Sequence, residues 1–414
     1  MNTGYRSTAH AGLWLLTALL FSLTFRSWNY TDEFFFRALS PPTEWLRENG
    51  YGISGMLLIL VAAYYSYRGP AGSFRMVWTP MYVQLAPVII FRLKLNFENG
   101  ETKGMLLSLA LAVTVAVCFG ASIPSALRCR ILTSRGINLA IFATGILWSG
   151  VSLFEWEYNE AAVVWNTRFQ GIAGHPNHAG LLLAICGIVG VGLAVIAERK
   201  AIRVLYAIGA LIMLLLIYWT ASRTAVVVFV VGVTALILER RRAVVIIALM
   251  MAAVCGTILS GMFMQAPDSM EDIRVVSTQN TRLEVWENLW TTFTKNVGIG
   301  AGETVVGSES SVLLILARTG LVGGIPFAIS CWLMLREAYR MLGCREGEKR
   351  VTDPRIAGAI IIAVLAGGVF EGYLKDEFSF PIYTVYLLLV SGKRFAPVSL
   401  PVQRRMGEFS EVAT

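Results

Sequence analysis

The residues best suited to chemistry gather in one short stretch, RFQGIAGHPNHAG at residues 168–180. It begins with Arg168 and carries Asn177 between His175 and His178, two of the three histidines in the chain. A guanidinium donates paired hydrogen bonds to phosphate oxygens, and the first turn of a helix attracts anions. Because a proline and a long apolar run follow His175, we expect a helix to start there. The stretch therefore predicts the rim of an anion-binding site.

These residues also have a purely structural interpretation. Arg168 could pair with the acids of the preceding segment, and the histidines could cap the helix and fix the loop. Those acids are Glu155, Glu157 and Glu160, and the first two also have the Asp-x-Asp spacing of a divalent metal site. Both interpretations stay open at the level of the sequence.

Arg223 lies between two apolar runs, in the sequence ASRTA. Its guanidinium could bind a diphosphate bidentately or anchor a span at the membrane boundary. Glu309, in a serine-rich stretch, carries a carboxylate that could serve as a general base. It could equally be a solvated loop residue. The reserve candidates for the base are the acids of FEGYLKDEF, namely Glu371, Asp376 and Glu377.

The elements that must position these side chains are membrane helices. Hydrophobic residues make up 56% of the 414-residue chain and charged residues 15%, so the chain is far more apolar than a soluble domain. Several uncharged runs approach the roughly 20 residues that cross a bilayer, and no β-barrel alternation is present. We predict an all-α, polytopic membrane protein of about 12 helices. The expected spans lie near residues 9–25, 51–66, 76–91, 104–124, 137–153, 178–197, 204–220, 224–238, 243–264, 319–335, 356–370 and 378–391.

These spans form a single predicted transmembrane domain over residues 1–392, followed by a disordered tail at 393–414. Basic residues set the orientation, because Lys and Arg concentrate in cytoplasmic loops. Clusters such as Arg240–Arg242 fall on the inner side only if both termini are cytoplasmic. The basic net charge, +8, then reflects topology, and no nucleic-acid partner is implied.

The longest outer loop, residues 265–318, should be partly helical. Thr281 and Glu284 fit a capping box, and apolar residues follow at the spacing of an amphipathic helix on the membrane surface. Arg282 shares the apolar face of that helix, so it should point toward the protein body or toward lipid headgroups. The segment from Ser311 to Gly320 is too short to span and predicts a half-helix lining a cavity.

Taken in order, these motifs resemble a known family. The first motif is RFQGIAGHPNHAG before one span, and the second is ASRTA at the start of another. A late outer loop follows, with Arg-x3-Trp, Gly-x-Gly, an aliphatic helix and Gly-Leu-x-Gly. This order is similar to the O-antigen ligase/polymerase superfamily, which includes WaaL-like ligases, Wzy-type polymerases and bacterial O-oligosaccharyltransferases. The resemblance covers roughly residues 135–390.

The resemblance implies a GT-C-like membrane glycosyltransferase that takes a glycan from undecaprenyl diphosphate and passes it to a hydroxyl acceptor. Family members usually carry a His-Asn pair at the start of the half-helix, where this chain has Glu309 and Ser310. With the resemblance added, the predicted catalytic residues are Glu309, Arg223 and Arg282, and the predicted donor-binding residues are Arg168, His175 and Asn177 together with the same two arginines.

We predict that the reaction polymerises O-antigen or exopolysaccharide repeat units without a metal or other cofactor, since arginines can stabilise a departing diphosphate. One alternative is a ligase that moves the glycan to lipid A-core or another acceptor. Another, of a different class, is a polysaccharide or lipid transporter, which would bury ionisable residues in mid-span. Here the middles of the spans are nearly free of charge, and the polar groups gather at the outer boundary.

The expected location is the bacterial inner membrane, with the active site on the periplasmic face. The expected partners are the glycan donor, a glycan or lipid acceptor, membrane lipids and, for a polymerase, a chain-length regulator.

Overall fold

The computed structural model describes the chain in several stretches. They are residues 3–25, 39–69, 76–77, 79–83, 85–86, 89, 100, 102–165, 167–238, 242–243, 245–247, 249–250, 281–302, 305, 310–344, 351–375 and 379–393. For residues 3–9, 165 and 281–283 the description covers the backbone alone.

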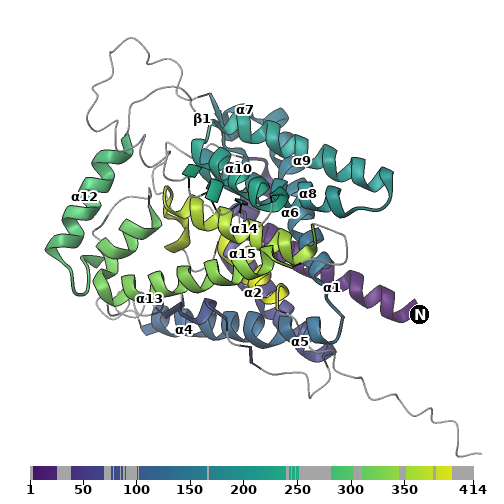
Figure 1. Cartoon of the computed structure of the whole chain (residues 1–414), viewed down its shortest axis with the longest axis horizontal. Helices are drawn as coiled ribbons and strands as arrows, with labels where there is room; N and C mark the ends of the chain where they lie inside the picture. The colour runs from purple at the N-terminus through teal and green to yellow at the C-terminus, as the bar shows by residue number, and fades with distance from the viewer. Residues whose placement is uncertain are drawn as a thin grey trace, which may run out of the picture.

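The described part of the chain is built almost wholly from helices (Figure 1). Six of them are long and apolar enough to cross a membrane: α2 (Pro41–Arg68), the helix of α4, η2 and α5 (Thr102–Arg128), α6 (Ser134–Tyr158), α8 (Pro176–Ile196), α9 (Lys200–Thr220) and α13 (Ser311–Leu342). Shorter helices accompany them, namely α1 (Thr3–Ser22), α10 (Arg223–Ile237), α14 (Asp353–Gly368) and α15 (Phe380–Ser391). The prediction of an all-α, multi-pass membrane protein is confirmed.

Ten of the expected spans overlap these helices. The two others, near 76–91 and 243–264, are described only in fragments, so the count of 12 stays a prediction. Of the predicted tail at 393–414, residues 394–414 also lie outside the described part of the chain.

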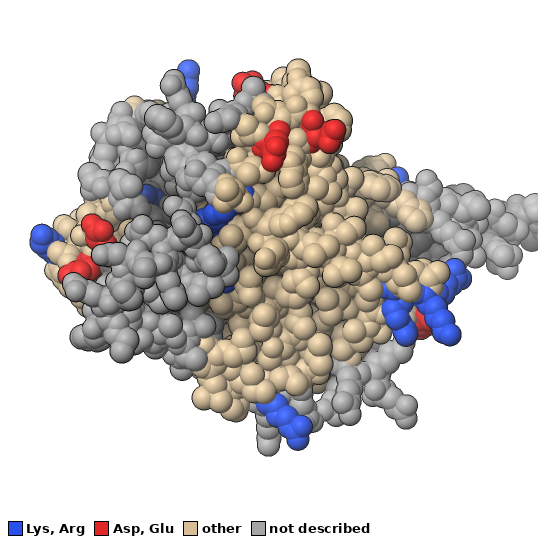
Figure 2. Space-filling model, turned by 90° about the horizontal axis from the view of Figure 1, so that it is seen from above, with Lys and Arg blue, Asp and Glu red and all other residues tan. Residues whose placement is uncertain are grey.

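The centre of the bundle is formed by α8, α14 and α15. In α8, 78% of the residues of its apolar 18-residue segment are buried, whereas in the neighbouring α9 the share is only 28%. A large cluster of buried apolar side chains joins α8 to α1, α2, α6, α10, α14 and α15. In Figure 2 uncharged residues form a broad continuous area, and the charged side chains visible in this view lie around the edge of that area. Such a distribution suits helices whose outer faces meet lipid.

One further helix, α12 (Thr281–Lys295), packs on the first part of α13. The amphipathic helix predicted from the capping box is α12, which lies beside the first part of α13 (Figure 1). Its Leu289 and Phe293 are buried against Leu314 and Ala317 of α13, while Trp290 is 52% exposed. The apolar face predicted from the spacing therefore packs on α13.

Gly320 divides α13 into two parts. Its φ of 58° and ψ of −153° are not helical, so a short helix from Ser311 ends there and a longer one follows. The loop after α12 crosses this break: Leu321 N donates to Val297 O (2.8 Å), and a Cβ on Gly320 would lie 2.4 Å from Gly298 O. Gly320 and, in the turn, Gly300, whose Cβ would lie 2.3 Å from the Arg318 carbonyl carbon, thus allow two backbones to touch. The predicted half-helix is present as the first part of α13.

Candidate functional site

Arg168 is placed by a small hairpin that precedes α8. The strands β1 (Val164–Trp165) and β2 (Arg168–Phe169) pair antiparallel, and this turns the Arg168 side chain toward the end of α9. Its Nε donates to Thr220 O (2.9 Å), and one terminal nitrogen donates to Asn177 Oδ1 (3.0 Å). The side chain predicted to bind an anion is therefore held in place by the ends of two helices.

The start of α8 agrees with the sequence prediction. His175 is the N-cap residue, and its Nδ1 accepts a hydrogen bond from Asn177 N (3.2 Å). The His178 ring lies edge-on to it, with ring centroids 5.4 Å apart. Burial, assisted by the positive charge of Arg168, lowers the pKa of His175 to about 4. At neutral pH the ring of His175 is therefore uncharged while it caps α8, and its predicted role in donor binding stays a prediction.

Gly180 lets this first turn of α8 approach the junction between α9 and α10. A Cβ at that position would lie 2.6 Å from the Ala225 Cβ and 3.0 Å from the Thr220 Oγ1. Any larger residue would push α8 away from the carbonyl that holds Arg168. The last glycine of RFQGIAGHPNHAG therefore has a packing role.

Asn177 links Arg168 to a buried carboxylate. Its Nδ2 donates to Glu371 Oε1 (2.9 Å), while its Oδ1 accepts from Arg168. Only this orientation of the amide satisfies both neighbours, because a guanidinium is solely a donor and a carboxylate solely an acceptor. A chain of hydrogen bonds therefore runs from Arg168 through Asn177 to Glu371.

Glu371 lies where the first turns of three helices meet. It is 6% exposed, and its Oε1 also accepts from Thr224 Oγ1 (3.2 Å) at the start of α10. Its backbone carbonyl accepts from Ser311 N (3.1 Å) and Ser311 Oγ (2.6 Å) at the start of α13. With Asn177 of α8, the three amino-terminal turns point their positive dipole ends at one region. This convergence favours negative charge.

The comparisons with known proteins bear on this region. Residues 208–328 match the family model described as O-antigen ligase, and no curated protein matches the chain. Over these residues the chain is similar to the O-antigen ligases. The match covers less than a third of the chain, from within α9 to within α13. It confirms the resemblance to the O-antigen ligase/polymerase superfamily and supports a membrane enzyme of that type.

The region that matches the O-antigen ligase model includes Arg223, the first residue of α10. The helix begins at this point because Ser222 caps it, with its Oγ accepting from Ala225 N (3.3 Å). Ala221 before it has a φ of 48°, which turns the chain sharply between α9 and α10. Arg168 donates to the backbone oxygens of Thr220 and Ala221, so two of the predicted arginines belong to one corner of the fold.

Other predicted site residues fall outside the described part of the chain. Glu309, Asp376 and Glu377 are among these, and of Arg282 only the backbone, in the first turn of α12, is described. Ser310, next to Glu309, is described: it is 2% exposed and caps α13 through Leu313 N (3.4 Å). The convergence of three arginines and the base role of Glu309 stay predictions.

The acidic pair Glu155-x-Glu157 is not arranged as a metal site. Glu155 is fully buried in α6 and accepts hydrogen bonds from Ser40 N (2.7 Å) and from the hydroxyls of Ser40 and Thr43 at the start of α2. Glu157 is exposed. Residues two apart on a helix face different directions, so Glu155 instead ties α6 to α2. Among the described residues no group of three His, Cys, Asp or Glu side chains could hold a metal ion.

Sequence reasoning ranked Glu371 only as a reserve and missed its neighbours Thr224 and Ser311. The available signal was position: each of the three residues starts a helix or follows the end of one, and short polar side chains at helix starts satisfy free N–H groups. Pairing them requires contacts across 194 residues in the case of Asn177 and Glu371. No local pattern specifies such a contact.

Proposed function

We propose that the chain is a membrane glycosyltransferase that uses an undecaprenyl-diphosphate-linked glycan on the outer face of the bacterial inner membrane. The favoured reaction joins repeat units of a surface polysaccharide, and transfer of the glycan to lipid A-core is the alternative. The observation that supports this proposal is the chain of hydrogen bonds from Arg168 through Asn177 to Glu371. The starts of α8, α10 and α13 meet there, beside Arg223 in the region that matches the O-antigen ligase model.

The proposed chemistry is a displacement at the anomeric carbon of the donor. The acceptor hydroxyl oxygen forms the new glycosidic bond and gives its proton to a carboxylate base, while the bond from the anomeric carbon to the diphosphate breaks. Arg168, Arg223 and Arg282 stabilise the charge that develops on the leaving diphosphate. No metal ion is needed for this step.

Glu309 remains the proposed base, and Glu371 has a positioning role. The Oε1 of Glu371 already accepts hydrogen bonds from Asn177 and Thr224, and its carbonyl fixes Ser311. A carboxylate held in this way orients the starts of α8, α10 and α13. In the sequence Glu309 comes directly before Ser310, the N-cap of α13, so Glu371 also fixes the start of the helix that follows the proposed base.

The proposal is tested with purified full-length protein in liposomes. The assay measures the rate at which the protein transfers glycan from a polyprenyl diphosphate donor to an acceptor. Arg223→Ala should slow transfer by about 30- to 1000-fold, the equivalent of losing about 2–4 kcal/mol of transition-state stabilisation. Arg223→Lys should restore only part of the rate, because an ammonium lacks the planar fork. The matched control is Arg336→Ala, which removes an exposed arginine from the far part of α13.

The products of the same assay separate the two reactions. A ladder of lengthening glycans indicates a polymerase, and a single transfer to lipid A-core indicates a ligase. Full activity of Arg223→Ala would reject the diphosphate role. Activity that is lost in excess chelator and restored by Mg²⁺ would reject the metal-free mechanism.

A further inference from the structure

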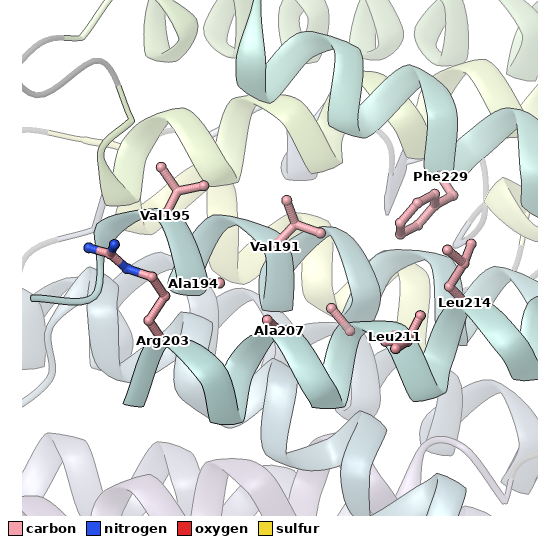
Figure 3. Close-up of a pocket in the computed structure, with 9 residues that line it drawn as sticks. Val191, Ala194, Val195, Arg203, Ala207, Leu211, Leu214 and Phe229 are labelled. Atoms are coloured by element: carbon pink, nitrogen blue, oxygen red, sulfur yellow. The ribbon is translucent and has the colours of Figure 1, made fainter. Parts of the chain in front are cut away.

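An apolar groove of about 580 Å³ lies between α8, α9 and α10, at the periphery of the helix bundle (Figure 3). Its walls are aliphatic side chains such as Val191, Val195 and Leu211, and Phe229 of α10 lies toward one end with Leu214. The opposite end has a charged lining residue, Arg203. The groove is thus apolar along its length and cationic at one end.

The length of the groove fits one leaflet of a bilayer. Arg203 and Leu214 are eleven positions apart on α9, which corresponds to about 16 Å of helix. Half of a bilayer's hydrocarbon core is about 15 Å thick. Because α9 is the least covered of the candidate spans, with 28% of its apolar window buried, the groove opens toward the surrounding lipid.

The charged end lies away from the candidate functional site. Arg168 of the candidate functional site donates to the carbonyl of Thr220, the last residue of α9, whereas Arg203 lies in the first turn of that helix. Arg199, the N-cap of α9, and Lys200, its first residue, stand beside a single acid, Glu198, so the local charge is positive. All three of these residues are exposed.

The Arg203 side chain is fixed at the rim of the groove. One terminal nitrogen donates to Ala197 O (2.9 Å), at the end of α8, and this holds the guanidinium beside Val195 (Figure 3). A guanidinium has five N–H donors, so the group keeps donors for a phosphate after this bond is made. Its fixed position lowers the entropy cost of binding one.

We propose that this groove binds an anionic phospholipid of the leaflet opposite the functional site. One acyl chain lies along α8 and α9 as far as Phe229, and the phosphate is held by Arg203 with Arg199 and Lys200 nearby. The polyprenyl chain of the donor is the less suitable occupant, because its diphosphate would have to lie at the other end of α9. The bound lipid would fasten α9 to α8 and α10, the helices that carry Thr220, Asn177 and Thr224.

The test uses photoactivatable lipids and does not depend on glycan transfer, so its failure is distinct from failure of the proposed function. Full-length protein is placed in liposomes with phosphatidylglycerol or phosphatidylcholine that carries a diazirine in the acyl chain, and labelled peptides are identified by mass spectrometry. Phosphatidylglycerol should label peptides from α8 and α9 in preference to phosphatidylcholine. Arg203→Gln should reduce this labelling about fivefold, since one basic residue near an anionic headgroup contributes about that factor.

Two further variants separate charge from shape. Arg336→Gln removes an exposed arginine elsewhere and should leave labelling unchanged, while Ala207→Phe should fill the groove and reduce labelling without changing the charge. Ala207 is exposed on α9, so the larger side chain can be accommodated without a change in the core.

Three results would overturn the proposal. They are equal labelling by the two phospholipids, displacement of phosphatidylglycerol by a polyprenyl diphosphate, and absence of labelling because a second copy of the chain covers the groove.

Discussion

Replacing Asn177 with aspartate tests the hydrogen-bond chain from Arg168 to Glu371 with almost no change of shape. The new carboxylate still accepts from Arg168, which lies 3.0 Å from Oδ1. Its other oxygen, however, replaces a donor that lies 2.9 Å from the Glu371 Oε1. Asn177→Asp thus changes one favourable contact into the meeting of two acceptors.

The size of the effect follows from this geometry. Two full charges 2.9 Å apart repel by about 6 kcal/mol at an effective dielectric constant of 20. Keeping a proton on one ordinary carboxyl at pH 7 costs less, about 4 kcal/mol. The folded variant should therefore hold an extra proton between the two side chains and lose about 4 kcal/mol of stability at pH 7.

The same reasoning gives the pH dependence. The folded variant binds more protons than the unfolded one, so its stability falls as pH rises. The deficit relative to the wild type should shrink by about 1.4 kcal/mol for each pH unit from 7 toward 5. Thermal unfolding of detergent-solubilised protein, followed by tryptophan fluorescence across this range, measures it. The double variant Asn177→Asp with Glu371→Gln should regain most of the stability, because the glutamine amide can donate to the new carboxylate.

Asn138→Asp is the matched control. Asn138 is buried in α6 and donates to Asp353 Oδ1 (2.9 Å) at the opposite end of α14 from the functional site. Asp353 is half-buried, so this control should lose less stability, and it should retain glycan transfer. The reasoning is refuted if Asn177→Asp is as stable as the wild type at pH 7, or if the double variant is no more stable than Asn177→Asp alone.

Three further predictions concern the rest of the fold. The pKa of His175 is lowered to about 4 in the folded protein, so as pH falls from 6.5 this side chain takes up a proton in the unfolded chain first. The free energy of unfolding should therefore drop by up to about 3 kcal/mol by pH 4. His175→Asn keeps a capping side chain and should remove this dependence in the same unfolding measurement. Gly320→Ala should lower the Tm much more than Gly302→Ala does. Both glycines have a positive φ, but of the two only Gly320 would place a Cβ against another backbone segment. A reporter fused after residue 290 should be active in the outer compartment and one fused after residue 345 in the cytoplasm, and reversal of either would reject the proposed orientation.

The amino-acid sequence by itself determined the helical elements and their capped starts. Apolar runs of span length leave the backbone no favourable partner but itself, so α6, α8 and α9 follow from composition. His175 and Pro176 specify where α8 begins, because capping and proline geometry act within a few residues. The order of the motifs was also enough to identify the superfamily, as the match over residues 208–328 confirms.

Tertiary structure alone decided which polar groups meet. Local rules could not tell whether Arg168 would pair with Glu155 or bind elsewhere, and packing directed Glu155 to Ser40 and Arg168 to Thr220. Glu371 meets Asn177 only because α14 returns its end to the start of α8, and Gly180 allows α8 to reach that corner. A buried carboxylate must find donors wherever the chain brings them, and in this fold those donors come from distant helix starts.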